Sequence, residues 1–533
     1  MDKTGELTST AACHRLGAAA LALTMLAGCL GPAYVPPPVA TPEAFKESSP
    51  QAYRTAIAGT WQPVRPRDAA LKGKWWELFG DPELNALEEQ LNINNQNIAQ
   101  SFENFMAARA QVHEARAAYF PTLTVAPSYT KSHAPGTVGA AAVAGNAAAA
   151  GGAAAGAANG GAGAGAGVGG GGGAGAGNGA TGVAGSFSEI SLPFDVSWEP
   201  DLWGRVRNMV REARAAAQVS AADLQNERLT EQADLAEYYF ELHGQDALQD
   251  LSNRTIAAYR ESLQLTRGLH ETGIDSDEDV AQAEVTLAGA EATSVGIATN
   301  RALYEHAIAT LIGKPASGFS MPVKPLSASV PPIPLGVPSQ LLERRPDVAA
   351  AERTMAEANA LIGVERTAYF PTLNLTGGTG LESTSLSKLF TAPAWFWTLG
   401  ASATETLFDG GLRRATLEQY TAQYNADVAA YRQTVLTAFQ QSEDYIATLR
   451  ISSEQLIRQR SAVSAAQRYL NIAIARYETG IDPYLDVITA QNTLFGDEQT
   501  EVTLRVSELT AAVELIQALG GGWDASQIAS AGR

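Results

Sequence analysis

The pentapeptide Glu271-Thr-Gly-Ile-Asp275 occurs a second time in this chain, as Glu478-Thr-Gly-Ile-Asp482. The second copy begins 207 residues after the first. At the same offset, Gly204-Arg-Val-Arg207 aligns with Gly411-Leu-Arg-Arg414. Motifs that repeat in the same order and at the same spacing indicate a tandem duplication, so each half of the chain is expected to build the same elements.

A third pair of motifs shows where the two halves differ. Ala118-Tyr-Phe-Pro-Thr-Leu123 returns as Ala368-Tyr-Phe-Pro-Thr-Leu373, which is 250 residues later. The first half therefore carries about 43 extra residues, and a Gly/Ala-rich tract between 134 and 186, without a charged residue, accounts for them. Such a tract has too little side-chain bulk to pack, so we predict a disordered loop; a silk-like structural role is the alternative.

Each half is predicted to fold in the same order: a helix, two short strands, a very long helix, a turn and a last helix. The Tyr-Phe-Pro motif ends the first helix, because proline cannot continue it. Gly273 and Gly480 are expected to end the long helices, since glycine readily takes the left-handed conformation of a helix C-terminus. The predicted helices are 82–117, 205–268, 277–312, 346–367, 412–477 and 483–519; the predicted strands begin at Leu123 and Leu373 and continue with 187–198 and 395–405.

The lengths of these elements restrict how they pack. A helix over residues 205–268 would be about 95 Å long, so the long helices are expected to lie side by side as in a coiled coil. Strands of about ten residues can cross an outer membrane, but four strands cannot close a barrel. An open sheet edge is not tolerated in lipid. Either the strands pack on the protein's own helices, or three chains pool twelve strands and twelve helices around a lumen about 28 Å wide.

The N-terminus resembles a bacterial lipoprotein signal. A short apolar run ends in Leu26-Ala27-Gly28-Cys29, which matches a lipobox. This resemblance implies cleavage after residue 28 and a diacylglycerol and an acyl (palmitoyl) group on Cys29; an ordinary signal peptide with a chance cysteine is the alternative. Acyl chains would anchor the mature chain to the outer membrane.

The composition excludes several classes of function. The formal net charge of −19 argues against nucleic acid as a partner, because nucleic-acid binding needs basic patches. The six histidines are scattered, and no nucleotide-binding or catalytic motif is present. We therefore expect no enzyme activity, no metal site and no cofactor other than the covalent lipid.

Several motifs together resemble the TolC-like outer-membrane efflux proteins, in particular their lipoprotein branch (NodT- or OprM-like). The motifs are Gly31-Pro-Ala-Tyr34, Trp75-Trp-Glu-Leu-Phe-Gly-Asp-Pro82, Leu341-Leu-Glu-Arg-Arg-Pro-Asp-Val348, Leu407-Phe-Asp-Gly-Gly411 and the two Tyr-Phe-Pro sequences. The resemblance implies a mainly α-helical homotrimer: a twelve-stranded outer-membrane β-barrel, with four strands from each chain, continuous with a long periplasmic α-helical barrel. It further implies a passive exit duct for drugs or other small molecules, working with a periplasmic adaptor protein and an inner-membrane RND-type pump.

On this basis the chain divides into six segments. These are a signal peptide (1–28), a lipidated extended segment (29–74), a first efflux repeat (75–314, with the tract 134–186 as an extracellular loop), a Pro-rich linker (315–340), a second repeat (341–523) and a C-terminal tail (524–533).

The resemblance also singles out candidate gate residues at the turns after the long helices. Asp279, Asp486 and Tyr477 match family positions that close the periplasmic end of the duct. The alternative for both aspartates is a favourable interaction with a helix N-terminus. By the same logic Asp275 and Asp482 are predicted to be helix caps.

Alternative functions stay open at this point. Within the same class, the duct could serve type I protein secretion or metal-ion efflux. A non-pore, structural periplasmic coiled-coil lipoprotein is the alternative from another class.

Overall fold

The computed structural model describes residues 32–39, 41–42, 44–47, 73–134, 185–333, 335 and 338–523. Cys29, the interior of the Gly/Ala tract and the tail 524–533 lie outside these residues. The chain forms two compact units, one of helices and one of strands, and each is considered by itself. Among the described helices, none combines the length and the apolar character needed to cross a bilayer.

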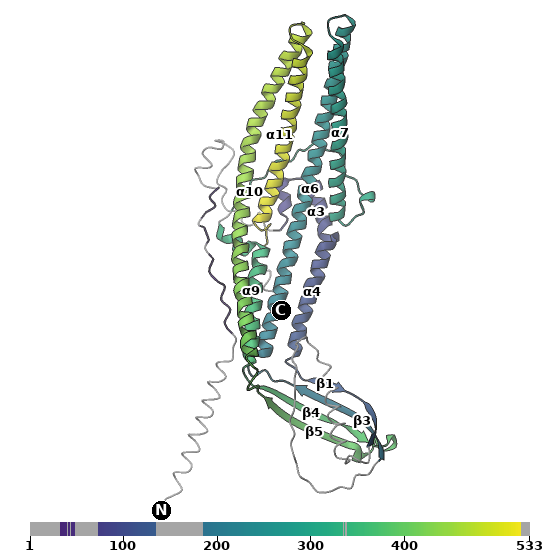
Figure 1. The fold of residues 1–533 in the computed structure, drawn as a ribbon, viewed down its shortest axis with the longest axis vertical. Helices are drawn as coiled ribbons and strands as arrows, with labels where there is room; N and C mark the ends of the chain where they lie inside the picture. The colour runs from purple at the N-terminus through teal and green to yellow at the C-terminus, as the bar shows by residue number, and fades with distance from the viewer. Residues whose placement is uncertain are drawn as a thin grey trace, which may run out of the picture. The chain divides into compact units, whose positions relative to one another are not determined.

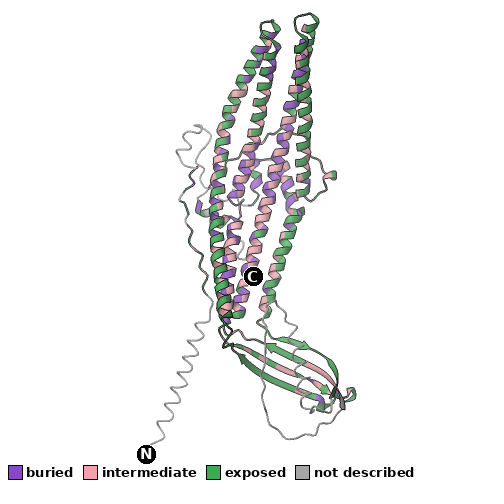
Figure 2. Ribbon diagram, viewed as in Figure 1, coloured by how far each residue is buried: buried purple, intermediate pink, exposed green. Residues whose placement is uncertain are grey.

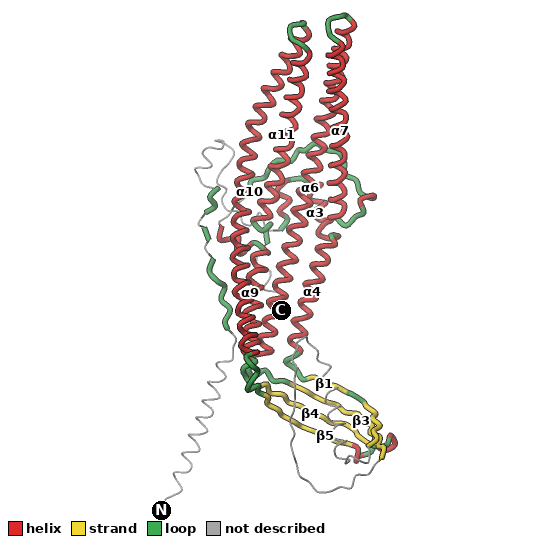
Figure 3. Tube along the Cα trace, viewed as in Figure 1, coloured by secondary structure: helices red, strands yellow, loops and turns green. Residues whose placement is uncertain are grey.

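The elements follow the predicted order (Figures 1 and 3). The helical unit contains η2 (Trp75–Phe79), α3 (Pro82–Asn94), α4 (Gln96–Ala117), α6 (Arg205–Glu271), α7 (Asp277–Leu311), η3 (Ala316–Gly318), η4 (Pro338–Gln340), α8 (Leu341–Arg344), α9 (Pro346–Thr367), α10 (Leu412–Glu478) and α11 (Tyr484–Ala518). The strand unit contains β1 (Thr122–Val125), β2 (Ser128–Ala134), β3 (Gly185–Trp198), β4 (Thr372–Ser383), η5 (Leu386–Lys388), η6 (Ala392–Ala394) and β5 (Trp395–Thr404).

Three pairs of helices confirm the duplication, because the two members of each pair are equal in length. Both α6 and α10 have 67 residues, both α7 and α11 have 35, and both α4 and α9 have 22. Helices α6 and α7 form one long hairpin, which we call the first hairpin, and α10 and α11 form the second (Figure 1). Helix α6 also packs on α9 and α11.

The prediction of one continuous helix over residues 82–117 is wrong. Asn95 is extended, with ψ of 127°, and separates α3 from α4. Its side-chain oxygen accepts the amides of Asn97 and Ile98 at 2.9 and 3.0 Å, so that a new helix starts there. The second repeat has the same break at Arg345, where Pro346 prevents α8 from continuing into α9.

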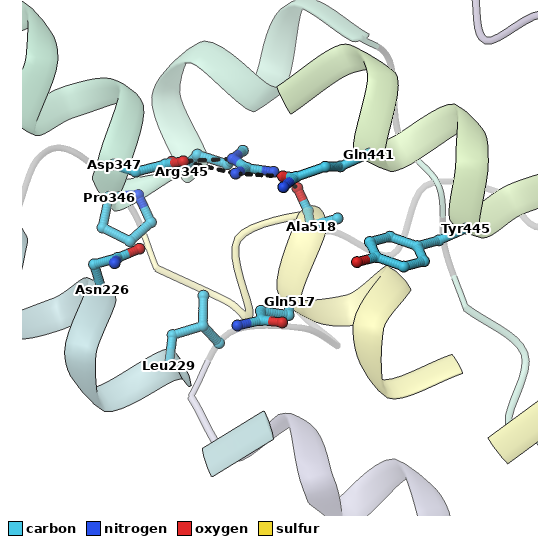
Figure 4. A pocket seen from close by; sticks show the side chains of 9 residues that line it. All are labelled: Asn226, Leu229, Arg345, Pro346, Asp347, Gln441, Tyr445, Gln517 and Ala518. Atoms are coloured by element: carbon cyan, nitrogen blue, oxygen red, sulfur yellow. Dashed lines mark hydrogen bonds and ion pairs between the residues drawn. The ribbon is translucent and has the colours of Figure 1, made fainter. Parts of the chain in front are cut away.

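Both breaks receive the end of a hairpin. The Asn95 side chain donates to the carbonyl of Leu311 at 2.9 Å, and Arg345 donates to the carbonyl of Ala518 at 3.2 Å. Figure 4 shows Arg345 between Asp347 and Gln441, to which it also donates. Each break therefore satisfies a C-terminal helix carbonyl that has no partner within its own helix.

The largest core contains residues of η2, α3, α6, α9, α10 and α11. Figure 2 colours the buried residues of the helices purple. Trp75 and Trp76 are buried there, and the indole of Trp75 donates to Gln232 at 3.3 Å. Asp81 caps α3 and accepts the hydroxyl of Tyr239 at 2.6 Å. The two-tryptophan motif thus explains how the start of the first repeat is fixed to the long helix α6.

The sheet is antiparallel, in the order β1-β3-β4-β5, with β2 also paired to β3. The predicted first strand is in two pieces, β1 and β2, because Pro127 has no amide to donate to the ladder. The pairing register with β3 is the same on both sides of the interruption. The sheet therefore has four strand positions, as predicted, but five strands.

The register places apolar side chains of all strands on one face. Val196 pairs with Leu123 and Gly377, and Leu381 pairs with Leu192 and Trp395. Many of these side chains are solvent-exposed in the single chain, including Leu123, Val125, Phe194, Trp395, Trp397 and Leu399. The other face is polar and carries the carboxylates Glu189, Asp195 and Glu382. This two-faced pattern is typical of a strand between lipid and an aqueous interior.

Candidate functional site at the hairpin tips

Both hairpins end in the same glycine turn. Gly273 has φ of +78°, and its amide donates to the carbonyl of His270 at 2.8 Å while Ile274 donates to Leu269 at 2.9 Å. Gly480 has φ of +70°, and the equivalent bonds of 2.8 and 2.9 Å repeat. This double bond pattern is the Schellman motif. The prediction that these glycines end the long helices is confirmed.

The prediction that Asp275 and Asp482 are helix caps is wrong. Ser276 caps α7, and it forms a capping box with Asp279: the Asp279 amide donates to the serine hydroxyl, which donates to the Asp279 carboxylate at 2.6 Å. In α11 the cap position is Pro483, which offers no side-chain acceptor. In both turns the cap lies one residue after the aspartate, which leaves the aspartate free for other contacts.

Those contacts differ between the tips. Asp482 holds Arg476 with two hydrogen bonds, one of 2.8 Å to a terminal guanidinium nitrogen. The bond to Arg476 lowers the pKa of the Asp482 carboxyl. Asp275 instead accepts the hydroxyl of Tyr477, which belongs to the second hairpin.

Tyr477 joins the two hairpins. Its side chain is buried, and its hydroxyl lies 3.1 Å from the hydroxyl of Thr266 on α6. Burial, together with the hydrogen bond to Asp275, raises the pKa of Tyr477 far above its ordinary value. Its ring packs on Tyr484 with centroids 5.4 Å apart. We call the contact of Tyr477 with Thr266 and Asp275 the tip latch.

The first hairpin has no equivalent of the tip latch among the described residues. His270 occupies the position that corresponds to Tyr477, and its two ring nitrogens lie 3.0 Å from the Asp275 carbonyl and 3.4 Å from the Asp277 carboxylate. Both contacts stay within its own turn. At this position of the repeat, therefore, only the side chain of the second hairpin, Tyr477, contacts the other hairpin.

The structure places Asp279 and Asp486 in the first turns of the two return helices, both half-buried. Asp279 is engaged in the capping box, which agrees with its helix-start interpretation. Asp486 acts electrostatically on Arg476 and has no role as an N-cap. Neither aspartate is hydrogen-bonded to Tyr477, so the three candidate gate residues do not form one bonded cluster.

Sequence reasoning missed Thr266, Arg476 and Tyr484. Tyr484 follows Tyr477 by seven residues across the turn, and that spacing of aromatics was the available signal. Within the described part of the chain, no three His, Cys, Asp or Glu side chains are grouped in a way that could hold a metal ion.

Two long hairpins on a duplicated helical unit, joined in the chain to a two-faced sheet, define the class of TolC-like outer-membrane channels. The chain belongs to the outer membrane efflux protein family, whose model matches residues 87–314 and 337–521. The resemblance inferred from the sequence motifs is thereby confirmed.

The similarity to individual relatives extends over almost the whole chain. The toluene efflux pump outer membrane protein TtgC of Pseudomonas putida is 31% identical over 507 residues, which is 94% of this chain and 95% of that protein. The antibiotic efflux pump outer membrane protein ArpC of Pseudomonas putida is 30% identical over 507 residues, with the same coverage of 94% and 95%. The solved structure of the outer-membrane channel OprN has a TM-score of 0.76 at 26% identity and covers 93% of this chain and 99% of OprN.

Proposed function

We propose that this chain is the exit duct of a tripartite efflux pump that exports small organic molecules, such as solvents or drugs, across the outer membrane. The observation that carries the proposal is the two-faced sheet with exposed apolar side chains, connected in the chain to two hairpins of 67 and 35 residues per helix. The names of TtgC and ArpC, which refer to toluene and antibiotics, support the substrate class.

The edges of the sheet support assembly of several chains. Strands β1, β2 and β5 lie at its edges, where one side of each backbone has no partner within the described sheet. Unpaired backbone groups are very costly in lipid. Three chains would pool twelve strand positions into a closed outer-membrane barrel, and their hairpins would form the periplasmic part of the duct. A periplasmic adaptor and an inner-membrane RND-type pump complete the proposed system.

The start of the mature chain supports a lipid anchor at Cys29. The side chain of Asn359 donates to the Pro32 carbonyl at 2.9 Å, and the Tyr34 hydroxyl donates to the Glu352 carboxylate at 2.6 Å. Phe45 is buried in the main core. Pro32 and Tyr34 are thus attached to α9, so acyl groups on Cys29, three residues before Pro32, would join the helical unit to the membrane.

The tips are proposed as the periplasmic gate. Asp279 and Asp486 would each form a ring of three carboxylates in a trimer, and like charges close together repel. The tip latch joins the two hairpins of each protomer at the same turns. Opening would require these contacts to separate or to move together with the hairpins.

Conductance in planar lipid bilayers tests this function. The purified protein should form channels, and the double variant Asp279→Ala/Asp486→Ala should change their conductance or cation selectivity. Glu278→Ala is the matched control, because Glu278 is exposed in the same first turn of α7. Absence of any channel would favour the structural lipoprotein, and channels unchanged in the double variant would remove the two aspartates from the gate.

Export assays in living cells distinguish the possible transported substrates. A strain that lacks the protein should accumulate toluene or antibiotics and recover export when the gene is returned. Loss of a secreted protein instead would favour type I secretion, and selective metal accumulation would favour metal-ion efflux.

A further inference from the structure

A basic groove lies on the helical unit between the beginning of α6 and the middle of α9. Its volume is about 510 Å³, which is large enough for a small ligand. The segment 32–34 forms one side of it. We call it the arginine groove; its charged lining residues are Arg211, Arg214 and Arg353.

The charges in this groove are not balanced. Arg353 contacts the carboxylate of Glu352 at 2.5 Å and donates to Gln218 at 3.3 Å. Arg211 donates to the side chain of Asn208 at 3.0 Å, and no carboxylate among the described residues forms an ion pair with Arg211 or Arg214. Both of these arginines are exposed. The groove thus presents two guanidinium groups that carry no counter-charge.

The second copy of the repeat lacks this feature. The residues that correspond to Arg211 and Arg214 on α10 are Glu418 and Thr421, and Glu103 of α4 corresponds to Arg353. The repeat can therefore fold without these arginines. Two uncompensated arginines side by side in a chain of net charge −19 indicate a ligand of negative charge.

The position of the groove in the chain points to lipid. Pro32 on its rim is three residues after Cys29, so a lipidated Cys29 would lie within about 11 Å of it. Arg211 follows Trp198, the end of β3, by thirteen residues. The groove is thus close along the chain to both proposed membrane attachments, and this step depends on the proposed anchor and barrel.

We propose that the arginine groove binds the phosphate of an anionic phospholipid headgroup. Guanidinium groups match phosphate oxygens with paired hydrogen bonds, which are stronger than neutral ones. Ala33, Ala215, Ala356 and Ala360 also line the groove, beside polar side chains such as Asn208 and Gln218, and they offer an apolar surface for the glycerol and the first acyl carbons. A bound lipid would fix the helical unit relative to the inner leaflet of the outer membrane.

Native mass spectrometry of the full-length, lipidated protein in non-ionic detergent tests this site with added phosphatidylglycerol. The variant Arg211→Gln/Arg214→Gln should bind this lipid about tenfold more weakly, or worse, as expected when a charge-assisted contact is lost. The matched control is Arg254→Gln/Arg267→Gln, two exposed arginines further along α6 that are paired with Asp250 and Glu284. The control should retain binding.

Three results would overturn the proposal. These are equal phosphatidylglycerol binding by the parent and the groove variant, equal binding of zwitterionic phosphatidylcholine, or displacement of the lipid by inorganic phosphate at similar concentration, which would assign the groove to free phosphate. The conductance of the parent protein in neutral-lipid bilayers examines the duct separately. Normal parent channels, with equal lipid binding by parent and groove variant, would reject the groove alone, whereas a parent protein that binds the lipid through the groove but forms no channels would reject the duct alone.

Discussion

The first hairpin and the second hairpin have the same helix lengths and the same glycine turn, yet Tyr477 in the second stands where His270 stands in the first. Tyr477 crosses to Thr266 and Asp275 of the first hairpin, whereas His270 stays within its own turn. The same position of the repeat thus holds Tyr477, which joins the two hairpins, in one copy and His270, which completes a local turn, in the other.

The same lesson holds at other equivalent positions. Arg345 and Asn95 both interrupt a helix and both cap the end of a hairpin, but with different chemistry. Ser276 caps α7 through its side chain, whereas Pro483 takes that position in α11 without one. The duplicated repeats share the same backbone elements. The side chains that differ between them determine which helices and hairpins are joined by hydrogen bonds and where charged groups lie.

The largest difference between the repeats should appear at the two helix breaks. Arg345→Ala removes a buried cation from Asp347, Gln441 and the Ala518 carbonyl, and it should lower the free energy of unfolding by about 3–5 kcal/mol. Asn95→Ala loses a cap, the bond to the Leu311 carbonyl and a bond of 2.6 Å to the Glu231 carboxylate, but it removes no charged side chain, and it should cost about 2 kcal/mol. Thermal unfolding followed by circular dichroism measures both, with Glu343→Ala on the exposed side of α8 as control. Equal losses at the two positions would contradict the different chemistry assigned to them.

The tip latch should come next. Tyr477→Phe removes the hydroxyl that donates to the Asp275 carboxylate, and a hydrogen bond to a charged group contributes about 1.5–3 kcal/mol. We expect faster amide hydrogen exchange at both tips and little change in the main core. Tyr469→Phe, at a more exposed position on the same helix, is the control. His270→Phe should accelerate exchange in the first turn alone. If His270→Phe accelerated exchange at both tips, joining of the hairpins would not be specific to the tip latch of Tyr477.

Two glycines of the second hairpin should respond with opposite signs. Gly480→Ala places a side chain at φ of +70° and should destabilise by about 1–2 kcal/mol. Gly496 is exposed in regular helix on α11 with open space around it, so Gly496→Ala should stabilise by about 0.5–1 kcal/mol. Chemical unfolding midpoints of both variants measure this. If both changes destabilise, the account of the turn loses its support.

The smallest expected effect depends on pH. Burial, with the nearby carboxylates of Glu514, Asp234 and Glu241, raises the pKa of Glu237 to about 7. Its protonated form is favoured in the folded state, so its contribution is present below about pH 4.5 and is lost as pH rises through 7. Glu237→Gln, which stays neutral, should leave stability unchanged at low pH and increase it by about 1 kcal/mol at pH 8, after allowance for solvent screening.

The control for this pH dependence is Asp444→Asn, at the exposed equivalent position on α10. Melting temperatures at the two pH values provide the measurement. A gain from Glu237→Gln that is as large at low pH as at pH 8 would show that its neutral form is not the one that the fold favours.

Much of this fold was predictable from local patterns. The repeat offsets predicted helices of equal length, Gly273 and Gly480 predicted the turns, and alternation in residues 187–198 predicted the two-faced strand. The breaks at Asn95 and Pro127 were missed, because single polar or proline residues within a longer periodic segment have little weight in the pattern. Alignment of Asn95 and Gln96 with Arg345 and Pro346 was the signal that could have revealed the first break.

The candidate site was less predictable, for a physical reason. The bond between Tyr477 and Asp275 joins residues 202 positions apart. Periodicity shows which face of a helix is apolar, but not which neighbouring hairpin that face meets. Asp275 was expected to serve its own helix, yet Ser276 takes that role and leaves the Asp275 carboxylate to the second hairpin.

The central claim is that three chains, each with two unequal repeats, together form one closed duct. Electron microscopy of the full-length protein, reconstituted into lipid discs, tests this claim most directly. We predict threefold particles with a central lumen, in which the six hairpins meet at the tips as three pairs, each pair joined by Tyr477. Single rods without a lumen would contradict the duct. A sixfold tip with evenly spaced hairpins would contradict the unequal repeats.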